Sequence, residues 1–447
     1  MTIFIPQLKR IIGFFAQKSF LLKIEKIKKL PAFIIAALFL TGFLIPENIK
    51  LDIISPVTFF SGEVKKTPPR QNEIFGFAPY WVFGEKLKNI DFNVLTTFAY
   101  FGIEVNDNGN LNRDNQSYKV FKSNEASEIF NKAHQSGTKV VLTLTQMDNS
   151  TIEAFLDNNK AQEKAIAQAV WEVGRRGIDG INLDFEYLGN PGPNYRNKFS
   201  RFVKRFSEVF HSWLSDPYVT VSVYASSAKD PKLYDIGSLS KYTDGIFMMA
   251  YDFATSSSKE AMPTAPLYGH KEGVYWYDIS TAVTDFLAEM PPEKLILGLP
   301  WYGYNYPVKS PQIKASVNNG YYVSKRVGRK FYRRFVSLPK PAQTHSIVSS
   351  FIKPDNTGLS DYKTGWDEFG QVGFRSYYQK NEGVYRMVFI EDEASLSLKY
   401  DFALDKNLMG VGVWALGFED GDDLWKGLRD KFGVKIADGG EITSAIR

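Results

Sequence analysis

The sequence of 447 residues contains no cysteine and only four histidines. The absence of cysteine excludes disulfides, thiolate nucleophiles and thiolate metal ligands. The four histidines are scattered, and no two of them have the spacing of a metal-binding pair. They are His134, His211, His270 and His345. A zinc site is therefore not expected, and the sequence predicts neither a metal nor a cofactor.

Outside the first 29 residues, the chain also lacks an excess of positive over negative charge. The formal net charge is +5, and residues 1–29 alone carry +6 from seven Lys or Arg and one Glu. The rest of the chain is therefore almost neutral, at −1. A body without a strong positive field has no general attraction for nucleic acid. The composition, 44% hydrophobic and 23% charged, is typical of a globular chain.

A long apolar run, residues 30–46, follows the basic segment 1–29. Uncharged runs of about 17–25 residues are long enough to cross a bilayer, and flanking positive charges stay on the cytoplasmic side. We therefore expect a transmembrane anchor that leaves the body of the chain outside the cytoplasm. A cleaved signal peptide, which would release a secreted protein, and a buried core helix are the alternatives. The segment 61–73 is polar and contains paired prolines, which is typical of a linker, and we assign the linker to residues 47–73.

From residue 74 onward, short β-rich runs alternate with helical patterns, of which 160–176 and 199–213 are the clearest. Mostly apolar strands separated by helices favour a parallel sheet covered by helices. Eight such units predict an α/β fold, a (β/α)8 TIM barrel over 74–432. A doubly wound open sheet is the alternative, but no Gly-x-Gly-x-x-Gly turn follows the first strand. The predicted strands are 74–81, 94–105, 139–145, 180–187, 218–226, 245–253, 294–304 and 410–418.

Residues 305–390 are too many for a loop between the seventh and eighth strands. We expect an α+β insertion there, and a C-terminal tail over 433–447. The insertion contains the basic and aromatic run "SKRVGRKFYRRF", residues 324–335. A nucleic-acid site has no other support in the sequence, and an anionic envelope polymer is the better partner for an exported protein. A solvated basic edge is the third interpretation.

The fourth predicted strand, "GINLDFEY", places acidic residues inside an apolar run. Because side chains alternate along a strand, Asn182, Asp184 and Glu186 share one face. In a barrel this face points inward, and Glu186 lies at the carboxyl end of its strand, where barrel active sites form. Burial and proximity raise the proton affinity of neighbouring carboxylates. One of them then acts as an acid while the other stays ionised, as glycoside hydrolysis requires.

Other interpretations of these acidic residues stay open on spacing alone. Such residues at a strand end also cap helices, bind cations, or pair with a nearby arginine such as Arg175 or Arg176. Asp179, which precedes Gly180, is expected to serve the turn before the strand.

Several sequence motifs, found in the same order as in a known family, favour the catalytic interpretation of these acidic residues. "DGINLDFE" resembles the Asp-Gly-x-Asp-x-Asp-x-Glu signature of family 18 glycoside hydrolases, the chitinase and N-acetylglucosaminidase group. "MMAYDF" resembles the Met-x-Tyr-Asp motif of the sixth strand, and "LILGLPWYG" resembles the seventh. "DEASLSLKYDFALDKNLMGVGVWALG" resembles the segment that leads to the eighth-strand tryptophan. The likeness spans about residues 74–430, and many members carry a small α+β domain at the place of the insertion.

The resemblance implies a substrate-assisted, retaining mechanism. Glu186 would protonate the glycosidic oxygen, and the substrate's own acetamido oxygen would close on the anomeric carbon. Asp184 would bind the acetamido N–H and balance the positive charge, while Tyr251 would orient the acetamido oxygen. Glu186 would then activate water. Trp414 would be the floor on which the sugar stacks, with a plain core tryptophan as the alternative.

The remaining site predictions concern substrate contacts. Met249 belongs to the sixth-strand motif, and Asp252 is expected to contact the sugar or Glu186, with a helix cap as the alternative. Four aromatic residues are candidates to line further sugar sites, each against a plain packing role. They are Trp81, Trp276, Trp301 and Tyr302.

Asn182 is expected to contact the substrate, and it is a departure from the family pattern, which typically has Asp at this position. An amide can hydrogen-bond Asp184 but cannot ionise, so we expect one fewer coupled titration and a simpler acid limb of the pH–rate profile. The predicted activity is hydrolysis of β-1,4-linked N-acetylglucosamine-containing glycans, such as chitin oligomers or peptidoglycan, by a membrane-tethered monomer. An inactive, lectin-like barrel that binds such glycans is the alternative.

Overall fold

The computed structural model describes residues 72–327 and 330–433. The predicted basic segment, the membrane anchor or signal, and nearly all of the predicted linker and C-terminal tail lie outside the described residues and stay predictions. Within the described residues, no helix has the length and apolarity needed to cross a membrane.

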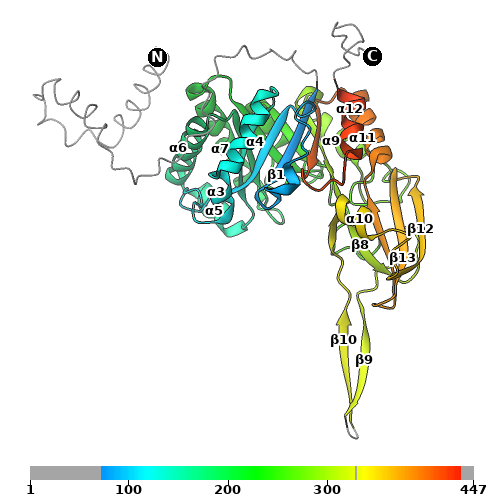
Figure 1. Ribbon diagram of the computed structural model, residues 1–447. Coiled ribbons are helices and arrows are strands. Elements are labelled where there is room, and N and C mark those ends of the chain that lie inside the picture. The colour runs from blue at the N-terminus through cyan, green and yellow to red at the C-terminus, as the bar shows by residue number, and fades with distance from the viewer. Residues whose placement is uncertain (1–71, 328–329, 434–447) are drawn as a thin grey trace, which may run out of the picture. The chain divides into compact units, whose positions relative to one another are not determined.

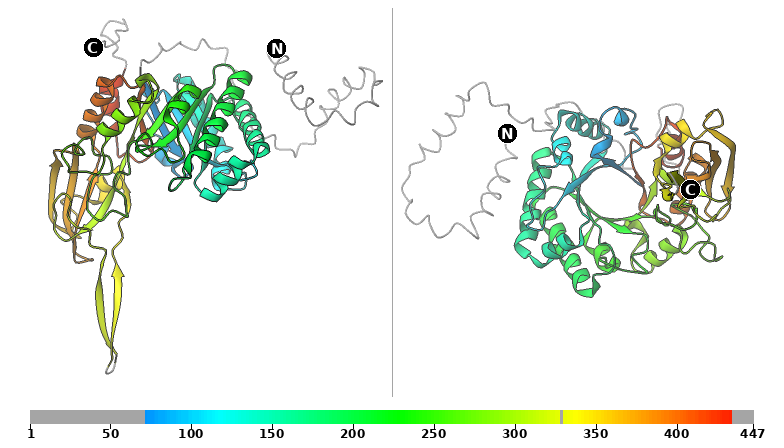
Figure 2. Two further views of the ribbon diagram at one scale, coloured as in Figure 1. Left: turned by 180° about the vertical axis from the view of Figure 1, so that it is seen from behind. Right: turned by 90° about the horizontal axis from the view of Figure 1, so that it is seen from below.

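Eight parallel strands close into a barrel in the order β1-β15-β7-β6-β5-β4-β3-β2. Each of them overlaps a run that the sequence predicted as a strand, so the predicted TIM barrel is confirmed. Figure 2 shows the strands around a central axis with the helices outside them. The barrel strands are β1 (Glu73–Pro79), β2 (Thr97–Glu104), β3 (Lys139–Gln146), β4 (Gly180–Phe185), β5 (Tyr218–Tyr224), β6 (Gly245–Met249), β7 (Leu295–Pro300) and β15 (Gly410–Trp414).

Helices follow the strands and cover the barrel, because each has an apolar face. The α-helices of this layer are α3 (Gln116–Phe121), α4 (Asn124–Gln135), α5 (Asn149–Asp157), α6 (Asn159–Arg176), α7 (Gly192–Trp213), α8 (Ile236–Tyr242), α9 (Ile279–Leu287), α11 (Glu393–Asp405) and α12 (Asp423–Phe432). Three short 3-10 helices are η2 (Tyr80–Val82), η3 (Glu85–Leu87) and η4 (Pro292–Lys294).

The alternation of β4 separates the helix-facing side chains from the polar ones. Phe185 packs against Phe199 and Phe202 of α7, with ring centroids 5.9 Å away in both cases. All three rings are buried. Burying a side chain of this size contributes about 1.5–3 kcal/mol. This packing fixes the register of β4, so that Asp184 has to point to the barrel interior.

The insertion between β7 and β15 is built on a five-stranded antiparallel sheet, in the order β11-β8-β14-β13-β12. It also contains the helix α10 (His345–Phe351) and a separate hairpin of β9 (Gly320–Val327) and β10 (Lys330–Ser337). Figure 1 shows this hairpin as a two-stranded ribbon. The sheet strands are β8 (Tyr302–Val308), β11 (Ala342–Thr344), β12 (Leu359–Asp367), β13 (Val372–Gln379) and β14 (Val384–Ile390).

The insertion begins earlier than residue 305. The run 294–304 is two strands instead of one, because β7 ends at Pro300 and β8 begins at Tyr302. Proline has no backbone N–H to continue a ladder, and the backbone N–H of Trp301 donates to the carbonyl of Trp414 at 2.8 Å. The chain therefore leaves the barrel at Pro300 and passes directly into the antiparallel sheet.

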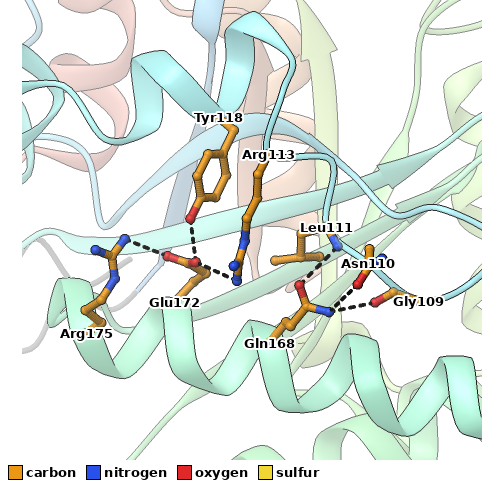
Figure 3. A network of polar contacts seen from close by, with 8 residues as sticks. All are labelled: Gly109, Asn110, Leu111, Arg113, Tyr118, Gln168, Glu172 and Arg175. Carbon is orange, nitrogen blue, oxygen red and sulfur yellow. Dashed lines mark hydrogen bonds and ion pairs between the residues drawn. The ribbon is translucent and has the colours of Figure 1, made fainter.

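A polar network on the outside of the barrel ties the loop after β2 to α6 (Figure 3). Glu172 is buried and accepts hydrogen bonds from Tyr118 at 2.6 Å, Arg175 at 2.9 Å and Arg113 at 3.3 Å. Arg176 donates to Ser127 and lies against two phenylalanine rings. Arg175 and Arg176 thus have their partners in the outer layer. They do not form ion pairs with the acidic residues of β4, so that alternative is wrong.

Candidate active site

A cleft of about 970 Å³ opens at the carboxyl ends of the barrel strands. This is the end at which TIM barrels assemble their active sites. Most of the predicted site residues line this cleft, although they come from five separate parts of the sequence. They are Trp81, Asp184, Glu186, Met249, Tyr251, Asp252, Tyr302 and Trp414.

Asp184 and Glu186 form the acidic centre of the cleft. Asp184 is 3% exposed, and one of its carboxylate oxygens, Oδ1, has no hydrogen-bond partner among the described residues. Burial raises the pKa of Asp184 well above its usual range, and the charge of Glu186 raises it further. Burial also raises the pKa of Glu186, which a hydrogen bond from Tyr224 and the charge of Lys232 oppose. The pair is thus arranged to hold a proton at a pH where isolated carboxylates are ionised.

Tyr251 follows β6 and shares the cleft with both carboxylates. Burial raises the pKa of its hydroxyl well above the usual value, and the charges of Asp184 and Glu186 add to this effect. The hydroxyl therefore stays protonated and available as a hydrogen-bond donor. A hydroxyl donor in this position can stabilise a substrate group that becomes negative or more polar during the reaction.

Asp252 is held on the rim of the cleft by three hydroxyl groups. Its carboxylate accepts hydrogen bonds from Tyr302 at 2.6 Å, Tyr304 at 3.2 Å and Thr264 at 3.2 Å. Its backbone has a φ of 59°, in the left-handed region that Asp tolerates better than most residues. Asp252 caps none of the described helices, so the helix-cap alternative is wrong. Its charge raises the pKa of Glu186, after the larger effect of burial.

Aromatic rings form the apolar part of the cleft. Trp414, at the end of β15, packs edge-on against Phe101 with ring centroids 4.6 Å apart. Its ring centroid lies 6.5 Å from that of Trp81. Trp81 is 52% exposed, and Trp276, on the same cleft, is 55% exposed. Flat exposed rings around a polar centre are surfaces on which sugar rings stack. Trp414 lines the cleft. This position argues against the alternative that it is only a packing residue of the core.

Asn182 lies below the cleft and does not line it. Its amide donates to Ser222 at 2.9 Å, and its carbonyl accepts from Thr220 at 2.9 Å. The side chain is completely buried. It therefore has no surface with which to contact a substrate, and the predicted substrate contact is wrong. The expected hydrogen bond to Asp184 is not formed either, because the hydroxyls of β5 take both ends of the amide.

Trp301 is the other predicted residue that the structure does not bring to the cleft. It lies between β7 and β8, is completely buried, and packs edge-on against Trp425 with ring centroids 5.2 Å apart. A buried ring offers no face to a sugar. The strand break at Pro300 turns Trp301 toward α12, and single-strand periodicity did not reveal that turn.

Two residues of the centre were missed in the sequence. Tyr224, the last residue of β5, hydrogen-bonds Glu186, and the ammonium group of Lys232 lies 4.5 Å from the centroid of its ring. The period of two in Thr220, Ser222 and Tyr224 does predict an inward tyrosine at the carboxyl end of the strand. Lys232 had no such signal, because it reaches the cleft from a loop through a backbone φ of 48°.

The arrangement provides a proton donor with a raised pKa, a buried neighbouring carboxylate, a phenol donor and a stacking surface. Among residues 72–327 and 330–433, no group of three or more His, Asp or Glu side chains is placed to hold a metal ion. Acid–base chemistry by carboxylates is what these residues can perform themselves.

Comparison with known sequences agrees with this chemistry. Residues 73–419 match the family described as "Glycosyl hydrolases family 18". The chain belongs to this family. It is a glycoside hydrolase, and the resemblance expected from the sequence is confirmed. A curated relative, the di-N-acetylchitobiase of Rattus norvegicus, is 25% identical over 383 residues, which cover 81% of this chain and 90% of the relative.

Solved structures show the same fold. The enzyme superposes on the group IV chitinase of Ostrinia furnacalis in complex with allosamidin with a TM-score of 0.65 at 19% identity, covering 80% of this chain and 97% of that one. The spore cortex-lytic enzyme SleL of Bacillus cereus gives a TM-score of 0.60 at 18% identity, covering 81% and 75% of the two chains.

Proposed function

We propose that the enzyme hydrolyses β-1,4-linked N-acetylglucosamine-containing glycans, with retention of configuration and with assistance from the substrate's acetamido group. The observation that carries this proposal is the convergence of Asp184, Glu186 and Tyr251 in one cleft beside the Trp414 ring. The relatives named above, a chitobiase, a chitinase and a cortex-lytic enzyme, support the same class of substrate.

Glu186 is the general acid in this proposal. It borders the open cleft, and burial raises its pKa, which favours the protonated form that a general acid needs. The proton goes to the glycosidic oxygen while the carbon–oxygen bond of the leaving sugar breaks. Glu186, now ionised, removes a proton from the incoming water in the second step, which returns the enzyme to its starting state.

Asp184 and Tyr251 handle the acetamido group. Asp184, behind Glu186 on the same strand face, accepts the acetamido N–H and so pushes its oxygen toward the anomeric carbon. Tyr251 donates its protonated hydroxyl to that oxygen. The nucleophile is then part of the substrate and is already in place, which supplies the benefit of an intramolecular reaction. The negative charge of Asp184 balances the positive charge of the cyclic intermediate.

The test compares two fluorogenic substrates, a di-N-acetylchitobioside and the matching cellobioside, which has a hydroxyl in place of the acetamido group. We expect hydrolysis of the first only, with the β-anomer as the first product in nuclear magnetic resonance spectra. Equal hydrolysis of both substrates, or an initial α-anomer, would contradict the mechanism. Binding of chitin oligomers without any release would instead identify a lectin-like protein.

A second arm separates the two polymers within the substrate class. Chitin oligomers and purified peptidoglycan sacculi are digested side by side, and the released reducing ends are counted. The preferred polymer is the one with the larger kcat/KM, and release from neither would contradict the proposed substrate class.

A further inference from the structure

The hairpin β9–β10 has no role in the proposed reaction. From Tyr321 to Arg326 and from Lys330 to Phe335, every residue is exposed, on both faces of the ribbon. Phe331 is 71% exposed and Tyr322 is 61% exposed. A two-stranded hairpin by itself is only marginally stable in water, and exposing large aromatic rings forgoes the free energy that their burial would contribute. Its composition is therefore better explained by binding to a partner.

The charge of this region is entirely of one sign. Residues 294–354 contain eleven Lys and Arg and no Asp or Glu, and six of these cations lie within 324–335. The remainder of the chain carries −6, since the whole chain is +5. The positive charge of the insertion is thus concentrated on the hairpin, and it attracts a partner of negative charge.

One face of the hairpin combines aromatic rings with guanidinium groups. Tyr322 and Phe335 are paired across the strands with centroids 5.2 Å apart. The guanidinium of Arg333 lies 4.7 Å from the Tyr322 ring centroid, and that of Arg326 lies 5.7 Å from the Phe331 centroid. These contacts hold cations and flat rings next to each other in a row.

The opposite face has a similar character. Because cross-strand partners share a face, Lys325 lies with Tyr332, and Arg334 lies with Val323. Cations thus alternate with rings on both faces along about 27 Å of strand, at ~3.4 Å per residue. Neither face presents a continuous apolar surface.

We propose that this hairpin binds a linear anionic glycopolymer, whose repeating units carry phosphate groups and sugar rings. A planar bilayer contacts only one face of a ribbon, whereas a flexible polymer can follow cations on both. The cations pair with phosphate groups, and the exposed rings stack on sugars. This site goes beyond the proposed hydrolysis and serves to hold the enzyme on the polymer.

The hairpin is connected to the border of the cleft. It follows residues 309–319 after the carboxyl end of β8, and it returns to β11, where Ala342 pairs with Tyr304. Tyr302 and Tyr304, which bind Asp252, lie at the opposite, amino-terminal end of β8. Residues of β8 and β11 line a groove of about 320 Å³ that also includes Trp414. At the base of the hairpin, the N–H of Leu338 donates to the carbonyl of Asn319 at 3.0 Å. A polymer held by the hairpin would therefore bring its neighbouring glycans to the cleft.

The experiment uses the full chain and two variants of equal charge. Four hairpin cations are replaced in the first variant, and four exposed lysines of the barrel helices are replaced in the control. The hairpin substitutions are Lys325→Gln, Lys330→Gln, Arg333→Gln and Arg334→Gln. The control substitutions are Lys119→Gln, Lys132→Gln, Lys160→Gln and Lys164→Gln.

The probe is poly(glycerol phosphate) substituted with N-acetylglucosamine. We expect the hairpin variant to bind it at least tenfold more weakly than the wild type, and the control to bind it normally. Between about 50 mM and 200 mM salt, the slope of log affinity against log salt should become shallower by about one for each phosphate group that the variant no longer binds. A double variant, Tyr322→Ser with Phe331→Ser, should lose the preference for this polymer over inorganic polyphosphate.

Equal binding by the hairpin variant and the wild type would overturn the proposal. Tighter hairpin-dependent binding to phosphatidylglycerol vesicles or to double-stranded DNA would overturn the partner class. Hydrolysis of a soluble chitobioside should be unchanged in the hairpin and control variants, with matching thermal unfolding. A wild type that binds the polymer but hydrolyses no glycan would contradict the proposed function and leave this inference intact.

Discussion

Glu186 and Glu391 occupy the same place in their strands, since each is the first residue after a largely buried strand, β4 and β14 respectively. Burial raises the pKa of both side chains. Their partners differ. Glu391 is 1% exposed and forms an ion pair of 2.7 Å with Lys399, which is completely buried. Glu186 has a tyrosine hydroxyl, a carboxylate neighbour and an open cleft.

Under the proposed function, this difference separates a structural carboxylate from a reactive one. Lys399 also donates to the carbonyl of Gln371 at 3.2 Å, so its ammonium ties β14, α11 and the turn before β13 together. A raised pKa alone therefore does not identify a catalytic group. Glu186 differs because it forms no ion pair among the described residues and because it lines the open cleft.

Replacing Glu186 with Gln should produce the largest change in activity. Without a proton to donate, kcat on a chitin oligomer is expected to fall by about 10²–10⁴-fold. Thermal unfolding should stay near that of the wild type, because no ion pair is broken. Substantial turnover by this variant, measured with a fluorogenic substrate, would sink the assignment of the general acid.

The matched change Glu391→Gln should act on stability instead. It leaves the ammonium of Lys399 buried without a counter-charge, which costs about 3–5 kcal/mol in the free energy of unfolding. Urea unfolding measures this loss. The double variant Glu391→Leu with Lys399→Met should recover most of it. If Glu391→Gln instead left stability intact and abolished activity, the two glutamates would not have the distinct roles described above.

Asp184→Asn tests how much the burial of an ionised, incompletely hydrogen-bonded carboxylate destabilises the fold. The pKa of Asp184 is raised by burial and then by Glu186, so its proton leaves at a higher pH in the folded protein than in the unfolded chain, where the pKa is about 3.9. Stability conferred by this group is present at low pH and falls as pH rises through the folded pKa. The variant should therefore be more stable than the wild type at neutral pH, although kcat drops by roughly 10²–10³-fold.

Unfolding curves at a series of pH values measure this effect. The stability gained by Asp184→Asn should shrink as the pH is lowered toward 4. A gain that grows with acidity, or a variant that is less stable at neutral pH, would show that Asp184 is satisfied in the native state.

Asn182→Asp should have the smallest effect. It places a third carboxylate beneath Asp184, and it removes the amide hydrogen bond to Ser222. We expect an additional coupled ionisation in the acid limb of the pH–rate profile, with kcat at the optimum changed by less than about fivefold, or ~1 kcal/mol. Thr220→Val, which removes a hydroxyl partner of Asn182 but adds no charge, is the control. An unchanged acid limb would refute the proposed role of the amide.

The periodicity of the sequence correctly predicted the strand and the helix that position the acidic centre. The alternation in β4 placed Asp184 on the barrel interior, and its position at the strand end placed Glu186 at the rim, as the structure has them. The apolar residues at helical spacing predicted α7, which in turn fixes the register of β4. These predictions succeeded because strand and helix periodicity are set by short-range geometry.

The failures come from contacts between distant segments. Trp301 belongs to a run that resembles one strand, but β7 and β8 are divided where the barrel gives way to the antiparallel sheet. Asn182 is next to Asp184 in the predicted face, yet it is bound by hydroxyls of β5, about forty residues along the chain. Lys232 reaches the centre from a loop whose path has no periodic pattern.

The sequence by itself determined the order of the strands along the chain, the acidic strand β4 and the family to which the enzyme belongs. These depend on residue type and on spacing within a few residues. Only the tertiary structure decided which groups meet. It paired Glu391 with Lys399, left Asp184 with an unpartnered oxygen, joined Tyr224 to Glu186, and exposed both faces of the β9–β10 hairpin. Burial and partners depend on closure of the barrel, which brings together side chains that the chain itself keeps far apart.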